Sequence, residues 1–282
     1  MIDIIRARTE FDHYLDGFDR DNEKIRLKII HTNEVVRCAG EIAKRMGLTQ
    51  EDRELAEVIA LLHDIGRFEQ MRKYDSFEPA TMNHAHFGVK LLFGSDNPRI
   101  RSFVASDQWD EIIREAIGRH SDYSVGYIED ERILLHAKLI RDADKLDNCR
   151  VKLTYDMKLL LGMEAEEIGA QPVTDIVFQA CMNHKSVRLA DRITKMDYWV
   201  SYIAYFFDIN FRETFQIIKE NDYVNRITDR VPYSNPDTRD KMEQIRRMVN
   251  EYIEQQSIPA QAYNNIRLNR QAFIKASTLS KS

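Results

Sequence analysis

Histidine and aspartate occupy positions in this sequence where helical periodicity leads us to expect an apolar side chain. His31 lies four residues before Val35 and eleven before Ile42. His63, His84, His120 and Asp144 lie four or seven residues from apolar or small neighbours. Positions with this spacing share one face of a helix. We therefore predict that five helices each direct an ionisable side chain into the interior of the protein.

A shared divalent cation explains this pattern better than five separate interactions. One buried histidine usually hydrogen-bonds to the backbone, and an isolated Asp144 would pair with a cation such as Arg141. Buried ionisable groups are costly unless they are paired or bind a cation. Adjacent helix positions point about 100° apart, so His63 and Asp64 reach one ion only near a helix end, which we place at Gly66. Imidazole and carboxylate ligands suit Mn, Fe, Co, Ni or Zn.

The elements that must position these side chains are helical. With 10 glycines and 6 prolines in 282 residues, the chain has little material for hairpins. Apolar spacing predicts helices over 22–46, 49–66, 83–93, 108–120, 131–146, 153–163, 173–182, 195–208, 211–219 and from 235 on. Residues 67–82 lack periodicity and are predicted to form an irregular loop. We find no alternating strand and no repeat, so we predict an all-α fold, with a polar tail from about Gln261.

Composition and cysteine usage limit the classes of function. The 41 basic and 46 acidic residues give a net charge of −5, whereas a nucleic-acid polymer would favour a basic protein. Cys38, Cys149 and Cys181 are odd in number and form no C-x-x-C pair, which argues against disulfide scaffolds and thiolate zinc sites. The N-terminus lacks the apolar stretch of a secretory signal, and no window suits a membrane span. We therefore expect a cytoplasmic protein.

The order H…HD…H…H…D resembles the HD-domain superfamily of metal-dependent phosphohydrolases. The resemblance spans about residues 25 to 150 and is carried by His31 and by the motifs LLHDIGRFEQ, NHAHFG, AIGRH and RDADKLDN. It implies an HD-like helical bundle over 1–150, with residues 151–282 as a helical extension packed on that core or as part of the same domain. It also implies that His31, His63, Asp64 and Asp144 hold one divalent ion. His84 and His120 match the ligands of a second ion, with Asp64 as the bridge; His86 is a rival for His84.

In activity, the resemblance implies hydrolysis of a nucleotide or another small phosphoester by a metal-activated water. Two alternatives stay open: a di-iron oxygenase of the same superfamily, and a non-catalytic regulatory HD module. The complete ligand set argues against the module, which would be free to lose ligands. The expected partner is a small phosphorylated substrate, without a membrane or a nucleic-acid polymer. The aromatic content of the C-terminal half fits both an extension of the helical body and a homodimer interface.

Two cations next to the expected ligands are candidates for binding substrate. Arg67 follows Asp64 by three residues, and Lys145 directly follows Asp144. Neither side chain can ligate a cation, and both are repelled by one unless an anion such as a phosphoester lies between. We therefore place both with Asp64 in the catalytic set. The alternative is a salt bridge to Glu69 or Asp147. In the expected loop, Phe68, Tyr74 and Phe77 are able to stack on a base or to pack in the core.

Overall fold

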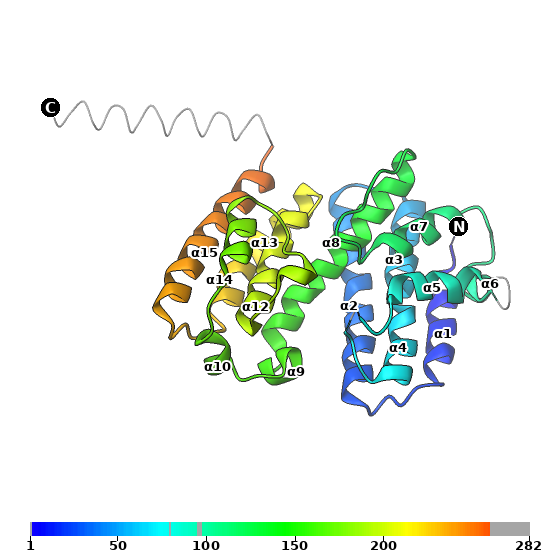
Figure 1. Ribbon diagram of the computed structural model, residues 1–282. Helices are drawn as coiled ribbons and strands as arrows, with labels where there is room; N and C mark the ends of the chain where they lie inside the picture. The colour runs from blue at the N-terminus through cyan, green and yellow to red at the C-terminus, as the bar shows by residue number, and fades with distance from the viewer. Residues whose placement is uncertain (1, 79, 95–97, 260–282) are drawn as a thin grey trace. The chain divides into compact units, whose positions relative to one another are not determined.

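The protein is all-α, as the sequence predicts. The computed structural model describes residues 2–78, 80–94 and 98–259, and these form helices without a strand (Figure 1). The predicted polar tail from Gln261 lies outside the described residues. The chain divides into two compact units. Unit 1 comprises residues 1–156 together with the short segment 208–211, and unit 2 comprises 157–207 and the chain from 212 on.

Unit 1 is built around two long helices, α2 (Glu23–Arg45) and α8 (Glu131–Thr154). They pack against each other, α3 packs on α2, and α7 packs on α8 (Figure 1). A second row is formed by α5, which contacts both α4 and α7. The remaining helices of this unit are α1 (Ile4–Leu15), α3 (Gln50–Leu62), α4 (Ile65–Tyr74), α5 (His84–Phe93), α6 (Ile100–Phe103) and α7 (Asp110–Arg119).

Three of these helices begin where the sequence predicts. The side chains of Asn22, Thr49 and Asn83 each accept a hydrogen bond from a backbone N–H group in the first turn of α2, α3 and α5. Such caps satisfy donors that have no partner inside the helix and contribute about 1 kcal/mol each. The caps therefore fix where the helices that carry His31, His63 and His84 begin.

The predicted irregular loop over 67–82 is wrong for its first half. Helix α4 begins at Ile65 and continues to Tyr74, so Gly66 lies inside a helix and does not end one. The segment shows no apolar period because Phe68, Glu69, Gln70 and Met71 are buried in succession. A helix covered on several sides has no single apolar stripe to detect. Within the predicted loop, the described residues without helical structure are those after Tyr74.

The predicted helix over 153–163 is also wrong as one element. Helix α8 does not end near Leu146 but continues through residue 150 to Thr154, and a short helix α9 (Met157–Leu161) follows. The additional turns of α8 bury Cys149, Val151 and Lys152. Asp147 and Cys149 thus belong to the same helix as Asp144. The buried face of α8 therefore continues beyond that aspartate toward the C-terminus of the helix.

Unit 2 is a separate set of helices that ends in the long α15. Its elements are α9, α10 (Ala165–Gly169), α11 (Asp175–Met182), η1 (Leu189–Asp191), α12 (Lys195–Ala204), η2 (Tyr205–Asp208), α13 (Arg212–Glu220), α14 (Tyr223–Thr228) and α15 (Pro236–Ser257). The side chains of Trp199, Ile203 and Phe206, spaced three to four residues apart in α12 and η2, are buried in the core. In the part of the chain that the structure describes, no helix is long and apolar enough to cross a membrane.

Gly66 is required because α4 and α5 approach each other at that residue. A Cβ atom on Gly66 would lie 2.2 Å from the carbonyl oxygen of His84 and 2.8 Å from the amide nitrogen of Gly88. Both atoms are backbone, so neither can move aside without shifting α5. The glycine therefore allows Asp64 and His84, at the starts of the two helices, to lie close together.

We predict that Gly66→Ala separates α4 from α5. The expected cost is about 1–3 kcal/mol of unfolding free energy or more, as for overpacked cores. Thermal melting followed by circular dichroism measures it. Gly118→Ala is the matched control, because its Cβ would lie an ordinary 3.5 Å from Val89 and alanine favours a helix. Equal melting temperatures for the two variants would contradict the packing argument.

Candidate metal centre

The six predicted ligands come from five helices of unit 1 and one helix junction. His31 lies in the middle of α2 and Asp144 in the middle of α8. The other four stand at helix ends: His63 caps the C-terminus of α3, Asp64 precedes α4, His84 is the first residue of α5, and His120 caps the C-terminus of α7. The predicted convergence of His63 and Asp64 near a helix end is thus observed, at the α3–α4 junction rather than at Gly66.

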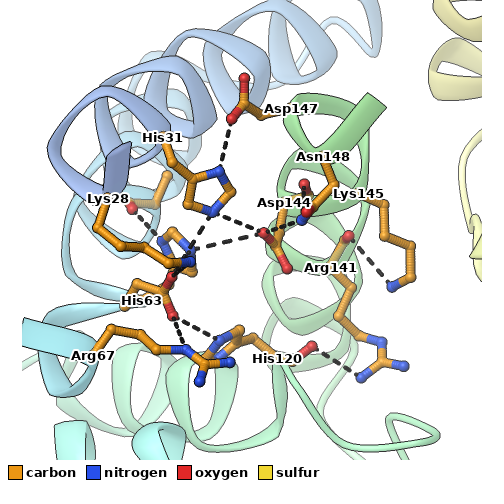
Figure 2. A network of polar contacts seen from close by, with 12 residues as sticks. Lys28, His31, His63, Arg67, His120, Arg141, Asp144, Lys145, Asp147 and Asn148 are labelled. Atoms are coloured by element: carbon orange, nitrogen blue, oxygen red, sulfur yellow. Dashed lines mark hydrogen bonds and ion pairs between the residues drawn. The ribbon is translucent and has the colours of Figure 1, made fainter. Parts of the chain in front are cut away.

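The first group of ligand atoms surrounds a space suited to one ion. Nε2 of His31 lies 3.8 Å from Asp64 Oδ2 and 3.1 Å from Asp144 Oδ1. Nε2 of His63 lies 3.7 Å from Asp64 Oδ2 and 4.0 Å from Asp144 Oδ1 (Figure 2). Four ligands at the usual 2.0–2.2 Å from a tetrahedral ion would be about 3.4 Å apart. The observed separations bracket that value.

The free ring nitrogens of this group support the same conclusion. Nε2 of His63 is buried and has no hydrogen-bond partner among the described residues, and Nε2 of His31 is buried with the Asp144 carboxylate of the same group beside it. Their opposite nitrogens are held: Nδ1 lies 2.7 Å from Asp147 Oδ2 for His31 and 2.6 Å from the Ala60 carbonyl for His63. An Nδ1–H group that donates to an acceptor leaves Nε2 with its lone pair, which is the arrangement of metal-binding histidines.

The second group lies on the other oxygen of the same carboxylate. Asp64 Oδ1 is 3.2 Å from His84 Nε2 and 3.6 Å from His120 Nε2, and the two ring nitrogens are 3.1 Å apart. His120 Nδ1 lies 2.7 Å from the carbonyl of Ile117, so its Nε2 is also directed inward. Within the described residues, His31–His63–Asp64 and Asp64–His84–His120 are the two clusters close enough to hold an ion. Asp64 is common to both, in the bridging position that the resemblance implies.

Burial and charge prepare these groups to bind a cation. Burial lowers the pKa of His63 to about 4 and the pKa of His84 to about 3, so both rings are neutral at pH 7. Burial raises the pKa of Asp64, but the Lys28 ammonium and the nearby histidines outweigh it and hold that pKa well below its usual range. Burial and Lys28 lower the pKa of His31, whereas the carboxylates of Asp144 and Asp147 raise it overall. A metal must therefore compete with a proton at His31.

The structure separates His84 from its rival. His84 is buried with its ring next to Asp64, whereas His86 is exposed two residues later. Of the other histidines, His13 and His184 are exposed, and His136 lies 3.2 Å from Asp52, away from both clusters. All six predicted ligands thus meet at one place, and no further histidine of the described residues joins them.

Arg67 and Lys145 lie near this centre, but each already has protein partners. Arg67 Nε is 3.6 Å from Asp64 Oδ1, and its Nη1 donates to Gln70 and to the carbonyl of Phe77. Lys145 Nζ forms an ion pair of 2.8 Å with Asp208 (Figure 2 shows it directed away from His31 and His63). Neither pairs with the carboxylates that the sequence offered as alternatives: Glu69 pairs with Arg72, and Asp147 with Arg150.

Arg141, which the sequence offered only as an alternative partner for Asp144, supports the site in a way that the sequence did not indicate. Its guanidinium does not pair with Asp144. It donates to the carbonyls of Arg119, His120 and Asp122 and forms a 2.6 Å ion pair with Asp208. Arg141 is almost completely buried and therefore holds the turn that carries His120. No local pattern links Asp208 to this turn, because 67 residues separate it from Arg141.

A second missed residue, Lys28, was detectable. It precedes His31 by three residues, so the two share one face of α2. Its Nζ lies 2.7 Å from Asp64 Oδ2. The same spacing argument that identified the histidines would have directed this lysine inward too.

Comparison with known families agrees with the geometry. Residues 29–149 match the family model described as HD domain. The matched residues resemble HD domains, a family of the metal-dependent hydrolase superfamily whose members bind divalent metals, and they contain all six candidate ligands. No curated protein and no solved structure matches the chain.

We predict that Asp64→Ala strongly weakens ion binding at both groups, because Asp64 is the one candidate ligand that belongs to both. Loss of an outer partner typically costs 10–100-fold in metal affinity, so loss of this ligand should cost about 100-fold or more. Calorimetric titration with Mn²⁺ measures the affinity, and circular dichroism checks that the variant stays helical. Asp75→Ala, at an exposed carboxylate, is the control. Stoichiometric metal in Asp64→Ala would refute this assignment.

We predict that Asp208→Asn weakens the second group selectively. Without the carboxylate, the buried charge of Arg141 loses its partner, and removing one partner of a buried pair costs about 3–5 kcal/mol at most. The turn at His120 should loosen, so Mn²⁺ stoichiometry should fall from two ions toward one. Asp229→Asn removes an exposed partner of Arg246 and should leave both ions bound. If Asp208→Asn binds both ions with unchanged affinity, Arg141 does not set the position of His120.

Proposed function

We propose that the protein is a phosphohydrolase that cleaves a nucleotide or another small phosphoester. The observation that carries this proposal is the shared carboxylate of Asp64, which has imidazole nitrogens on each oxygen and cations at its edge. When bound, divalent ions in the two groups would lower the pKa of a water molecule and neutralise phosphate oxygens. The identity of the metal belongs to the proposal as well, with Mn, Fe, Co, Ni and Zn all compatible with the ligands.

The residues of this chain have distinct tasks in that reaction. Asp147 and the Ala60 carbonyl hold the rings of His31 and His63 with Nε2 inward, which fixes the ligands before substrate arrives. Arg67 is largely buried, donates to the Phe77 carbonyl and presents a guanidinium next to Asp64 Oδ1. Guanidinium groups bind phosphate oxygens with short, charge-assisted hydrogen bonds.

The aromatic residues considered for base stacking differ in their positions. Phe68 is fully buried and packs against Phe11, Tyr14 and Phe18, so it belongs to the core. Tyr74 is exposed, and Phe77 lies under the ammonium of Lys28. Of these three aromatic residues, Phe77 is the one whose ring contacts a charged group of the centre. The proposed cytoplasmic location rests on the three cysteines, which are buried and free.

Hydrolysis of phosphorylated metabolites in the presence of different divalent metals tests this function. The expected result is release of phosphate or a nucleotide product with at least one metal, and its loss in Asp64→Ala. Turnover that requires O₂ and bound iron, seen after anaerobic purification, would favour the oxygenase instead. Metal binding without any turnover would favour a regulatory module.

We predict that Arg67→Ala lowers kcat/KM and leaves the metal content unchanged. The expected loss of transition-state stabilisation is that of a hydrogen bond to a charged group, about 1.5–3 kcal/mol. Lys145→Ala is expected to act in the same way if its ammonium leaves Asp208 for the substrate. Steady-state kinetics and metal analysis of both variants measure the effects. A lower melting temperature with kcat/KM within about twofold would instead assign the residue to its salt bridge.

A further inference from the structure

Lys28 is a cation at the metal centre that the proposed reaction does not yet use. It lies on α2, one turn before His31, and extends toward the same space as His31 and His63 (Figure 2). Its ammonium is 2.7 Å from Asp64 Oδ2, and the side chain is 14% exposed. The Nζ atom also lies 5.4 Å from the centre of the Phe77 ring. The side chain of Lys28 is therefore largely buried at the centre.

The contact places the lysine in conflict with an ion. Oδ2 of Asp64 is the same oxygen that faces His31 and His63 in the first group. An ammonium has three donors and no lone pair, so it cannot join the ligands. A divalent ion on Oδ2 would repel a charge on the same atom across a short, poorly screened distance. Lys28 can stay in place only when a negative group lies between it and the ion.

A balance of charges gives the same result. Lys28 and Arg67 carry two positive charges, and Asp64 and Asp144 carry two negative charges. The carboxylate of Asp147 is neutralised by Arg150. The four central groups are thus balanced by themselves, and each divalent ion adds two positive charges. An anion with more than one negative charge would restore the balance.

The ammonium also has hydrogen-bonding capacity left. Among the described residues, Asp64 is the one acceptor of a hydrogen bond from Lys28. Two of its three N–H groups therefore remain for a ligand. A tetrahedral oxyanion can accept them with one oxygen while another of its oxygens faces the ion.

We propose that Lys28 binds the phosphoryl group of the substrate on the side of Asp64 Oδ2, and that it makes anion binding and metal binding interdependent. This inference rests on the proposed function, because it takes a phosphoester as the ligand. Without the anion, Lys28 opposes the first ion; with the anion, the two cations share it. Since coupling is reciprocal, the anion must tighten metal binding by the same factor that the metal tightens anion binding.

Calorimetric titration of the full-length protein with Mn²⁺, with and without methylphosphonate, tests the inference. Methylphosphonate carries three phosphoryl oxygens on a negatively charged group and has no ester bond to hydrolyse. In the wild type, it should tighten Mn²⁺ binding by about tenfold, within the usual range of coupling between sites. Lys28→Met should bind Mn²⁺ alone more tightly than the wild type, and methylphosphonate should change that affinity less than about twofold.

Lys24→Met is the matched control, because Lys24 lies one turn earlier on α2 and pairs with the exposed Asp75. It should retain the coupling of the wild type. Lys28→Arg keeps the charge and should retain most of the coupling. If Lys28→Met does not fold, Lys28→Gln, which also removes the charge, takes its place in the comparison with the control. Circular dichroism of each variant establishes that it is folded.

Retention of wild-type coupling in Lys28→Met would overturn the inference, as would the absence of coupling in the wild type. Weaker Mn²⁺ binding in Lys28→Met with the coupling intact would assign the lysine to holding Asp64. These titrations involve no turnover. Coupling without hydrolysis of any phosphoester would therefore contradict the proposed function alone, and hydrolysis without coupling would contradict only the role of Lys28.

Discussion

The arrangement of unit 1 depends on one buried carboxylate, that of Asp64. A buried charge is tolerated only when its surroundings compensate it, and here each oxygen faces its own set of partners. Oδ2 faces His31, His63 and Lys28, and Oδ1 faces His84 and His120. These partners come from four different helices. Their relative positions are therefore constrained by a group of a few atoms at the α3–α4 junction.

Helix ends provide the precision that this carboxylate needs. His63, Asp64, His84 and His120 stand at termini, where side chains can leave the helix surface at angles that a regular turn does not allow. Gly66 brings two of those termini together by removing a side chain between backbones. Arg141 fixes a third through the carbonyls after α7. The centre is thus positioned by backbone contacts more than by side-chain packing.

The sequence predicted the candidate ligands because they occupy positions on the apolar faces of helices. Buried positions recur every three to four residues along a helix, so they can be recognised from spacing. The same logic failed for α4, whose buried residues follow one another, and it placed the helix end at Gly66, where the requirement is close approach. It also cut α8 short near Leu146, since Asp147 and Lys152 are polar residues on a buried face. Asp208 could not be found by spacing, because its contact with Arg141 joins distant parts of the chain. Local periodicity reports burial, but not which distant groups meet.

The return of residues 208–211 to unit 1 has a consequence for how the protein is made. The carboxylate of Asp142 is fully buried, and it accepts hydrogen bonds from the amide N–H groups of Asn210 and Phe211 and from the Asn210 side chain. During synthesis, unit 1 therefore emerges from the ribosome well before the donors that complete it. Roughly fifty residues of unit 2 must be added first. Unit 1 thus cannot finish folding as an independent N-terminal piece, and cutting the chain after α8 would remove part of its interior rather than a neighbouring domain.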